Sequence, residues 1–187
     1  MFLPPTLPHV TDRRFLIPEP LDGYSPVVGE ALWRLEESRE RTVALIERLP
    51  DGAVDWVPPW GPNTIGTLLY HLALIELDWL SSEILEQEPP EEFLRLFPVD
   101  HRDAAGRLGV MVGETFDGHL ARLHAVRARV LYSLRDMDEG DFLRTRSLPD
   151  YDVSPAWVIH HLTQHEGEHR GQIGEIAAAG GFLPQGE

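Results

Sequence analysis

The chain has 187 residues, 42% of them hydrophobic, and a formal net charge of −15 from 31 acidic and 16 basic residues. This length and apolar content suit one domain with a sizeable core, and the negative charge opposes binding to nucleic-acid phosphates. Cysteine is absent, which excludes disulfides and thiolate metal ligands, so a metal site would need histidine, aspartate or glutamate.

The beginning of the chain does not resemble a targeting segment. Residues 1–18 lack a basic start followed by a continuous apolar run, and no stretch approaches the roughly 18 apolar residues of a membrane span. We therefore expect a cytoplasmic protein that binds neither membranes nor nucleic acids. Prolines recur through residues 1–26 and predict an extended arm, which covers apolar surface or contacts a partner chain; residues 27–187 form the predicted domain.

Apolar residues at intervals of three and four predict a first helix over residues 27–49, with charged residues on a solvated face. The loop that follows places Trp56 and Trp60 between prolines. Two tryptophans in a stiff loop could wall a pocket or plug the end of a helix bundle, and both interpretations stay open.

A second helix is predicted over residues 63–87, with Asn63 or Thr64 as its N-cap. His71 lies in its apolar stripe, where a leucine would otherwise pack. Residues 88–112 then form a long connection with a short helical piece near 91–96, which a bundle with one long crossover tolerates.

A third helix is predicted over residues 114–136. His119 and His124 flank its stripe, and we interpret both as packed or solvated rather than as ligands. Three arginines add positive charge to this helix: Arg122, Arg127 and Arg129. Pairing with the abundant acids is the interpretation we favour for them over recognition of an anionic substrate.

The fourth predicted helix spans residues 154–176, with Ser154 as N-cap and Pro155 at the first helical position. The positions that recur at intervals of three or four are Val158, Leu162, His165, His169, Ile173 and Ile176. His165 and His169 are one turn apart, a spacing that lets two imidazoles reach one metal ion. His161 continues the row at the edge of the stripe, so we favour the later pair.

One helix face cannot complete a metal site, because the ion needs donors from another direction. His71 on the second helix is the candidate third ligand. Three histidines from two facing helices would leave room for water or substrate, as in an open catalytic site.

Two segments resemble the DinB family of damage-inducible four-helix-bundle metalloproteins: NTIGTLLYHLALIE around His71 and HLTQHEGEHRGQI around His165 and His169. The resemblance covers about residues 28–180 and implies an all-α, antiparallel four-helix bundle with a long crossover connection. It also implies a metal held by His71, His165 and His169. The family is related to transferases that use low-molecular-weight thiols such as mycothiol or bacillithiol.

The segment HEGEH also matches the His-Glu-x-x-His motif of zinc proteases, in which Glu166 would be the general base. Such proteases usually take a third ligand downstream, and no histidine follows His169, so the DinB interpretation is favoured. Glu166 or Glu168 could orient an imidazole or act as a base, although a solvated face is the simpler interpretation of both. Gln172 could hydrogen-bond a ligand.

These features predict a metal-dependent enzyme that acts on a small molecule, as a thiol S-transferase or a hydrolase. A non-catalytic metal-binding stress-response module is the alternative, and simple packing of the histidines is a third, which would be costly in an apolar core. Zinc, nickel or iron fits the ligand set. By analogy with related folds we expect a homodimer.

Overall fold

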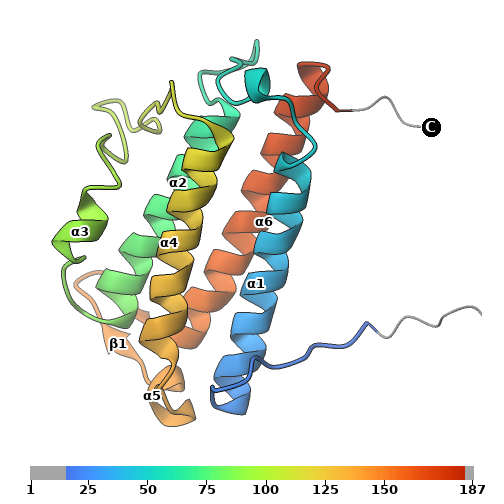
Figure 1. The fold of residues 1–187 in the computed structure, drawn as a ribbon. Helices are drawn as coiled ribbons and strands as arrows, with labels where there is room; N and C mark the ends of the chain where they lie inside the picture. Colours follow the sequence, from blue (N-terminus) through green and yellow to red (C-terminus); the bar gives the residue numbers. More distant parts are fainter. Residues whose placement is uncertain (1–15, 184–187) are drawn as a thin grey trace, which may run out of the picture.

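The computed structural model describes residues 16–183, and four long helices form a bundle (Figure 1). These helices are α1 (Pro26–Ile46), α2 (Ile65–Trp79), α4 (Phe116–Leu134) and α6 (Pro155–Ala179). Helix α2 continues as a π-helical turn, η2 (Leu80–Ile84). The shorter elements are η1 (Asp51–Ala53), α3 (Glu91–Leu94), α5 (Glu139–Leu143) and the antiparallel strands β1 (Arg146–Ser147) and β2 (Asp152–Val153).

The all-α prediction is confirmed, and hydroxyl side chains begin three of the long helices. Thr64, Thr115 and Ser154 each accept a hydrogen bond from a backbone N–H of the first turn. Pro155 occupies the first position of α6, where no N–H is needed. Residues 1–15 of the predicted arm lie outside the described residues, and Pro26, its predicted last residue, is the first of α1.

The long connection from η2 to α4 carries the chain back along the bundle. In Figure 1 the chain rises along α1, descends along both α2 and α4, and rises again along α6. The pairs α1–α6 and α2–α4 are therefore parallel, whereas α2–α6 and α1–α4 are antiparallel. The bundle is thus of the crossover type, with antiparallel packing limited to two of its four helix pairs.

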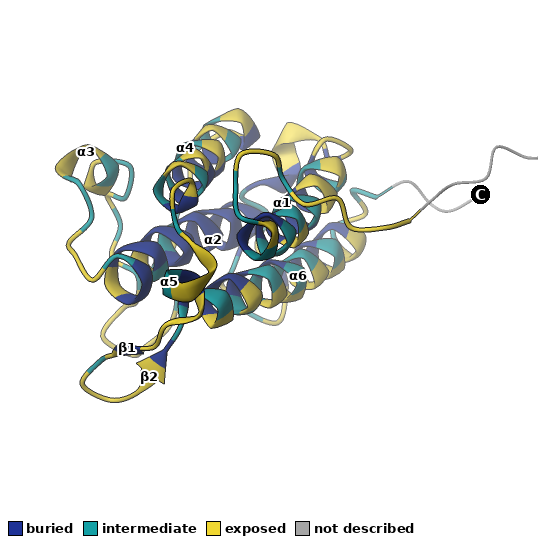
Figure 2. Cartoon of the chain, turned by 90° about the horizontal axis from the view of Figure 1, so that it is seen from below, coloured by how far each residue is buried: buried dark blue, intermediate teal, exposed yellow. Residues whose placement is uncertain are grey.

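Helix α2 is the most enclosed of the four. Figure 2 shows it buried along most of its length, because α4, α6 and the long connection surround it. Tyr70 shows how the connection is attached: its hydroxyl donates to the carbonyl oxygen of Val99 at 2.7 Å and accepts from the Val99 N–H at 2.9 Å. Within the described residues, no helix is both long and apolar enough to cross a membrane.

A buried ionic cluster joins all four helices. Arg39 of α1 and Arg127 of α4 contact Glu76 of α2 and Glu166 of α6 at nitrogen–oxygen distances of 2.7 to 3.2 Å. None of these four residues is more than 5% exposed. Arg127 also reaches Glu36 at 2.6 Å. An unpaired buried charge is costly, so the cluster favours the one packing of the four helices in which these charges meet.

The cluster corrects the predicted face of the fourth helix. The buried stripe of α6 runs through Val158, Leu162, Glu166 and Ile173. Glu166 is only 2% exposed, so the prediction of a solvated glutamate is wrong at this position. His165 precedes it by one residue, about 100° around the helix, and therefore lies at the edge of the stripe, partly exposed.

Candidate metal centre

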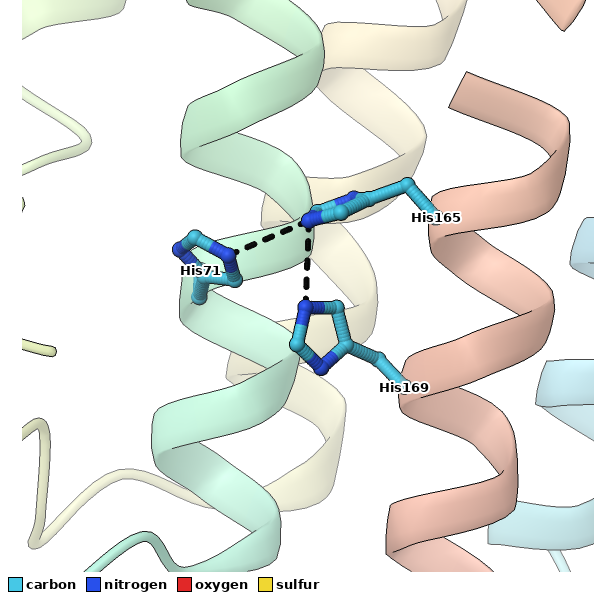
Figure 3. A group of neighbouring side chains, drawn as sticks. All are labelled: His71, His165 and His169. Carbon is cyan, nitrogen blue, oxygen red and sulfur yellow. Dashed lines mark hydrogen bonds between the residues drawn. The ribbon is translucent and has the colours of Figure 1, made fainter. Parts of the chain in front are cut away.

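Three imidazoles converge where α2 and α6 face each other (Figure 3). Nε2 of His165 lies 3.2 Å from Nε2 of His71 and 3.0 Å from Nε2 of His169. One nitrogen from each ring lies within 4.8 Å of the others, and among the described residues no other such group of three possible ligands occurs. The structure thus brings together the three histidines that the sequence singled out.

The helix geometry explains this convergence. His165 and His169 are one turn apart on α6, so their side chains project from the same face. His71 comes from α2, which runs antiparallel to α6 beside it, and the residue is 6% exposed. The donors therefore approach from two directions, as a shared ion requires.

The environment keeps the imidazoles neutral. Burial, together with the neighbouring His169 and His165, lowers the pKa of His71 to about 3. Burial, together with the nearby His169 and His161, lowers the pKa of His165 to about 3, and burial lowers the pKa of His169. Neutral imidazoles have a free lone pair, which is the form that binds a metal.

Gln172 determines which nitrogen of His169 carries a proton. Its Oε1 lies 2.8 Å from Nδ1 of His169, and a carbonyl oxygen can only accept, so Nδ1–H is the donor. The lone pair of neutral His169 is then on Nε2, which faces the other two rings. This is the arrangement by which a neighbouring group orients a metal-binding histidine.

The short distances between the three nitrogens are explained better by a shared cation than by hydrogen bonds among the rings. With Nε2 of His169 unprotonated, a single proton can bridge only one of the two contacts made by Nε2 of His165. Two nitrogens at about 2.0–2.1 Å from a tetrahedral zinc ion are roughly 3.3–3.4 Å apart, close to the observed 3.0 and 3.2 Å. The cluster could therefore hold a divalent ion.

His101, on the long connection, was missed by the sequence analysis. Its ring stacks on that of His71 with centroids 5.2 Å apart and an interplanar angle of 12°. Its Nε2 is buried and has no hydrogen-bond partner within the described part of the chain. The residue belongs to no helix period, so only the return of the connection across α2 places it here.

Other candidate residues lie away from the three nitrogens. Glu166 has one carboxylate oxygen bound by Arg39 and the other by Arg127, so neither is free to act as the base of a zinc protease. Glu168 is exposed, in agreement with a solvated face. His119 is fully buried beside Arg122, and His124 is exposed, in agreement with packed and solvated roles.

His161 connects the histidine cluster to a neighbouring pocket. Its ring lies 5.9 Å from that of His165, 4.5 Å from that of Trp79 and 5.0 Å from that of Trp157. The two tryptophans line a pocket of about 750 Å³, the aromatic pocket, with Tyr151 and Asp152. Trp157 is two turns before His165, about 12 Å along α6.

A second pocket lies on the other side of the cluster. It encloses about 420 Å³ and is lined by Trp60, Leu68, Gln172 and Ile176 among others, and we call it the Trp60 pocket. Gln172 joins it to His169. Trp56 instead packs edge-on against Phe182, with centroids 5.8 Å apart. Each tryptophan thus has one of the two predicted roles: Trp60 lines a pocket, and Trp56 packs at an end of the bundle.

The comparisons with known proteins agree with this structure. A family model described as the DinB superfamily matches residues 34–173, which include all four long helices in whole or in large part. The match contains His71, His165 and His169 together with every member of the buried ionic cluster. No curated protein matches the chain. With three quarters of its length covered by that match, the chain belongs to the DinB superfamily.

Proposed function

We propose that this protein is a metal-dependent enzyme that transfers a low-molecular-weight thiol to or from a small-molecule substrate. The observation that carries the proposal is the convergence of three neutral Nε2 atoms on one point, with no fourth ligand from the described residues in the group. Three protein ligands are the number that leaves a divalent ion with a position for a reactant.

The ion and the protein residues would contribute different parts of the chemistry. A bound divalent cation would supply a Lewis acid that lowers the pKa of a thiol or water. His71, His165 and His169 supply uncharged ligands, which leave the full positive charge of the ion available. Gln172 holds His169 in the tautomer that presents Nε2. His101 covers part of His71 and narrows the approach from that side.

The two pockets support a reaction with two reactants. The aromatic pocket and the Trp60 pocket lie on opposite sides of the histidine cluster, connected to it by His161 and Gln172. A transferase must hold a donor and an acceptor at once, whereas a hydrolase needs one organic substrate and water. The chain has no cysteine, so the reacting thiol would come from a small molecule.

Metal content tests the centre itself. We expect about one divalent ion per purified chain, by elemental analysis, and its loss in His165→Ala and His169→Ala. His161→Ala is the matched control, because it lies on the same helix one turn earlier and should lose much less. Full metal occupancy in His71→Ala would refute the two-helix site.

The reaction class is tested with the cobalt-substituted protein. Thiols such as bacillithiol, mycothiol or simple alkyl thiols are expected to produce strong sulfur-to-cobalt charge-transfer bands, and His165→Ala should abolish them. A spectrum that ignores every thiol but responds to hydroxamates or phosphates would point to hydrolysis. A spectrum that responds to no ligand would point to a non-catalytic metal-binding module.

A further inference from the structure

The aromatic pocket has a layered aromatic wall. Trp157 stacks on Trp79 with centroids 5.5 Å apart and on His161 with an interplanar angle of 9°. Trp157 is nevertheless 49% exposed, and Tyr151 on the hairpin loop is 47% exposed. Such exposure is unusual for stacked aromatic rings that serve only the core, and it leaves π surface available to a ligand.

The charge in the lining of this pocket is negative. Asp152 lines it, and no arginine, lysine or histidine is among the residues that do. The nearest arginines in sequence are already paired, because Arg144 and Arg146 both bind the carboxylate of Asp141. Among residues 16–183, the pocket therefore has no free guanidinium with which to bind an anion.

A buried carboxylate lies behind the aromatic wall. Glu83, in the π-helical turn after Trp79, is 7% exposed, and its Oε1 accepts a hydrogen bond of 2.9 Å from the Tyr151 hydroxyl. Its Oε2 is buried without a hydrogen-bond partner in the part of the chain that the structure describes. A buried carboxylate with an unsatisfied oxygen is costly, and a nearby cation would offset that cost.

One feature favours the opposite charge. The N-terminus of α6 meets the pocket at Ser154 and contributes a partial positive charge of roughly half a unit. Ser154 already accepts the N–H of Trp157, and the carboxylate of Asp152 stands two residues before it. The full charge of Asp152 therefore outweighs this partial charge, and the carboxyl group of Glu83 adds to the preference for a cation.

We propose that the aromatic pocket binds an organic cation, such as a substituted ammonium group, against the exposed faces of Trp157, Trp79 and Tyr151 with Glu83 as its counter-ion. Aromatic faces beside a carboxylate are the arrangement that proteins use for quaternary ammonium groups. This proposal adds organic cations as a substrate class to the proposed function. Only the role of the cation as a substrate rests on that function. The binding itself requires no turnover.

Titration calorimetry with choline tests the binding, with 3,3-dimethylbutan-1-ol as the neutral ligand of the same shape. Choline is expected to bind on the order of tenfold more tightly than the alcohol. Trp157→Ala and Glu83→Gln should each weaken choline binding by roughly tenfold. Trp60→Ala, in the Trp60 pocket, is the matched control and should leave the affinity for choline unchanged. Tyr151→Phe removes the hydrogen bond to Glu83 without removing the ring and serves if Glu83→Gln folds poorly.

Three outcomes would overturn the proposal: equal binding of choline and the alcohol, no heat from millimolar choline, or preferential binding of acetate or inorganic phosphate. Equal losses in Trp60→Ala and Trp157→Ala would also overturn it, because the signal would not come from this pocket. Metal content is measured on the same samples. A variant that keeps its metal and loses choline thus separates failure of this proposal from failure of the metal centre.

Discussion

Arg127→Met is the most direct test of the buried ionic cluster. Arg127 donates to both oxygens of Glu76, at 2.7 and 3.0 Å, and to Glu166 at 3.2 Å. Methionine fills a similar length without charge, so the substitution removes the ion pairs more than the packing. Arg39 would then be the remaining cation between two buried carboxylates.

The expected cost follows from that imbalance. Removing one partner of a buried ion pair destabilises a protein by about 3–5 kcal/mol, because the other charge stays buried without compensation. For a chain of this size each kcal/mol lowers Tm by roughly 2–4 °C, so Tm should fall by about 6–20 °C. The double variant Arg127→Met/Glu76→Gln removes one charge of each sign and should lose at least about 1 kcal/mol less than the sum of the single losses.

Urea and thermal unfolding followed by circular dichroism measure these values. Arg135→Met is the control, because Arg135 lies at the end of the same helix and is exposed, so its loss should change stability by less than about 0.5 kcal/mol. If Arg127→Met cost no more than this control, the cluster would not hold the helices together, and the reasoning would fail.

Gln172→Ala should weaken metal binding by about 10- to 100-fold with little change in Tm, because only the orientation of His169 is lost; competition with a chelator measures this. Burial alone would raise the pKa of Glu76, but the guanidinium groups of Arg127 and Arg39 outweigh it and hold that pKa below its usual 4.5. Its contribution to stability is therefore complete above pH 4.5 and is lost as the pH falls through the lower folded value, and unfolding of Glu76→Gln from pH 6 to pH 3, roughly, should show a smaller decline. Sedimentation at micromolar concentration should find a homodimer, and a monomer would contradict that expectation.

Local periodicity accounts for what the sequence predicted well. The four long helices follow from apolar intervals and cap residues, and their observed ends lie within about three residues of the predicted ones when the π-helical turn η2 is counted with α2. His165 and His169 are recognisable from spacing within one helix. His71 needed the further step that a second helix must supply a ligand.

Long-range partners account for what the sequence could not show. A glutamate such as Glu166 next to a candidate ligand histidine resembles a solvated or catalytic residue in the sequence. Its partners lie on other helices, 127 positions away for Arg39 and 39 for Arg127. His101 stands in a connection without any period. Helix α5 and strands β1 and β2 are too short to produce a periodic pattern, yet their hairpin supplies Tyr151 to the aromatic pocket.

The π-helical turn at the end of α2 would allow a single deletion to alter the aromatic pocket while leaving the histidine cluster unchanged. In that turn the N–H of Leu85 donates to the carbonyl of Leu80 five residues earlier, so it contains one residue more than an α-helical path would use. Removing the exposed Ser82 would restore α-helical spacing and displace Glu83, which lies inside the turn, relative to His71. Glu83 would then leave Tyr151 while His71, three turns upstream, kept its place. A loss or gain of one residue here could therefore change the ligand that the aromatic pocket accepts without changing the arrangement of the three histidines.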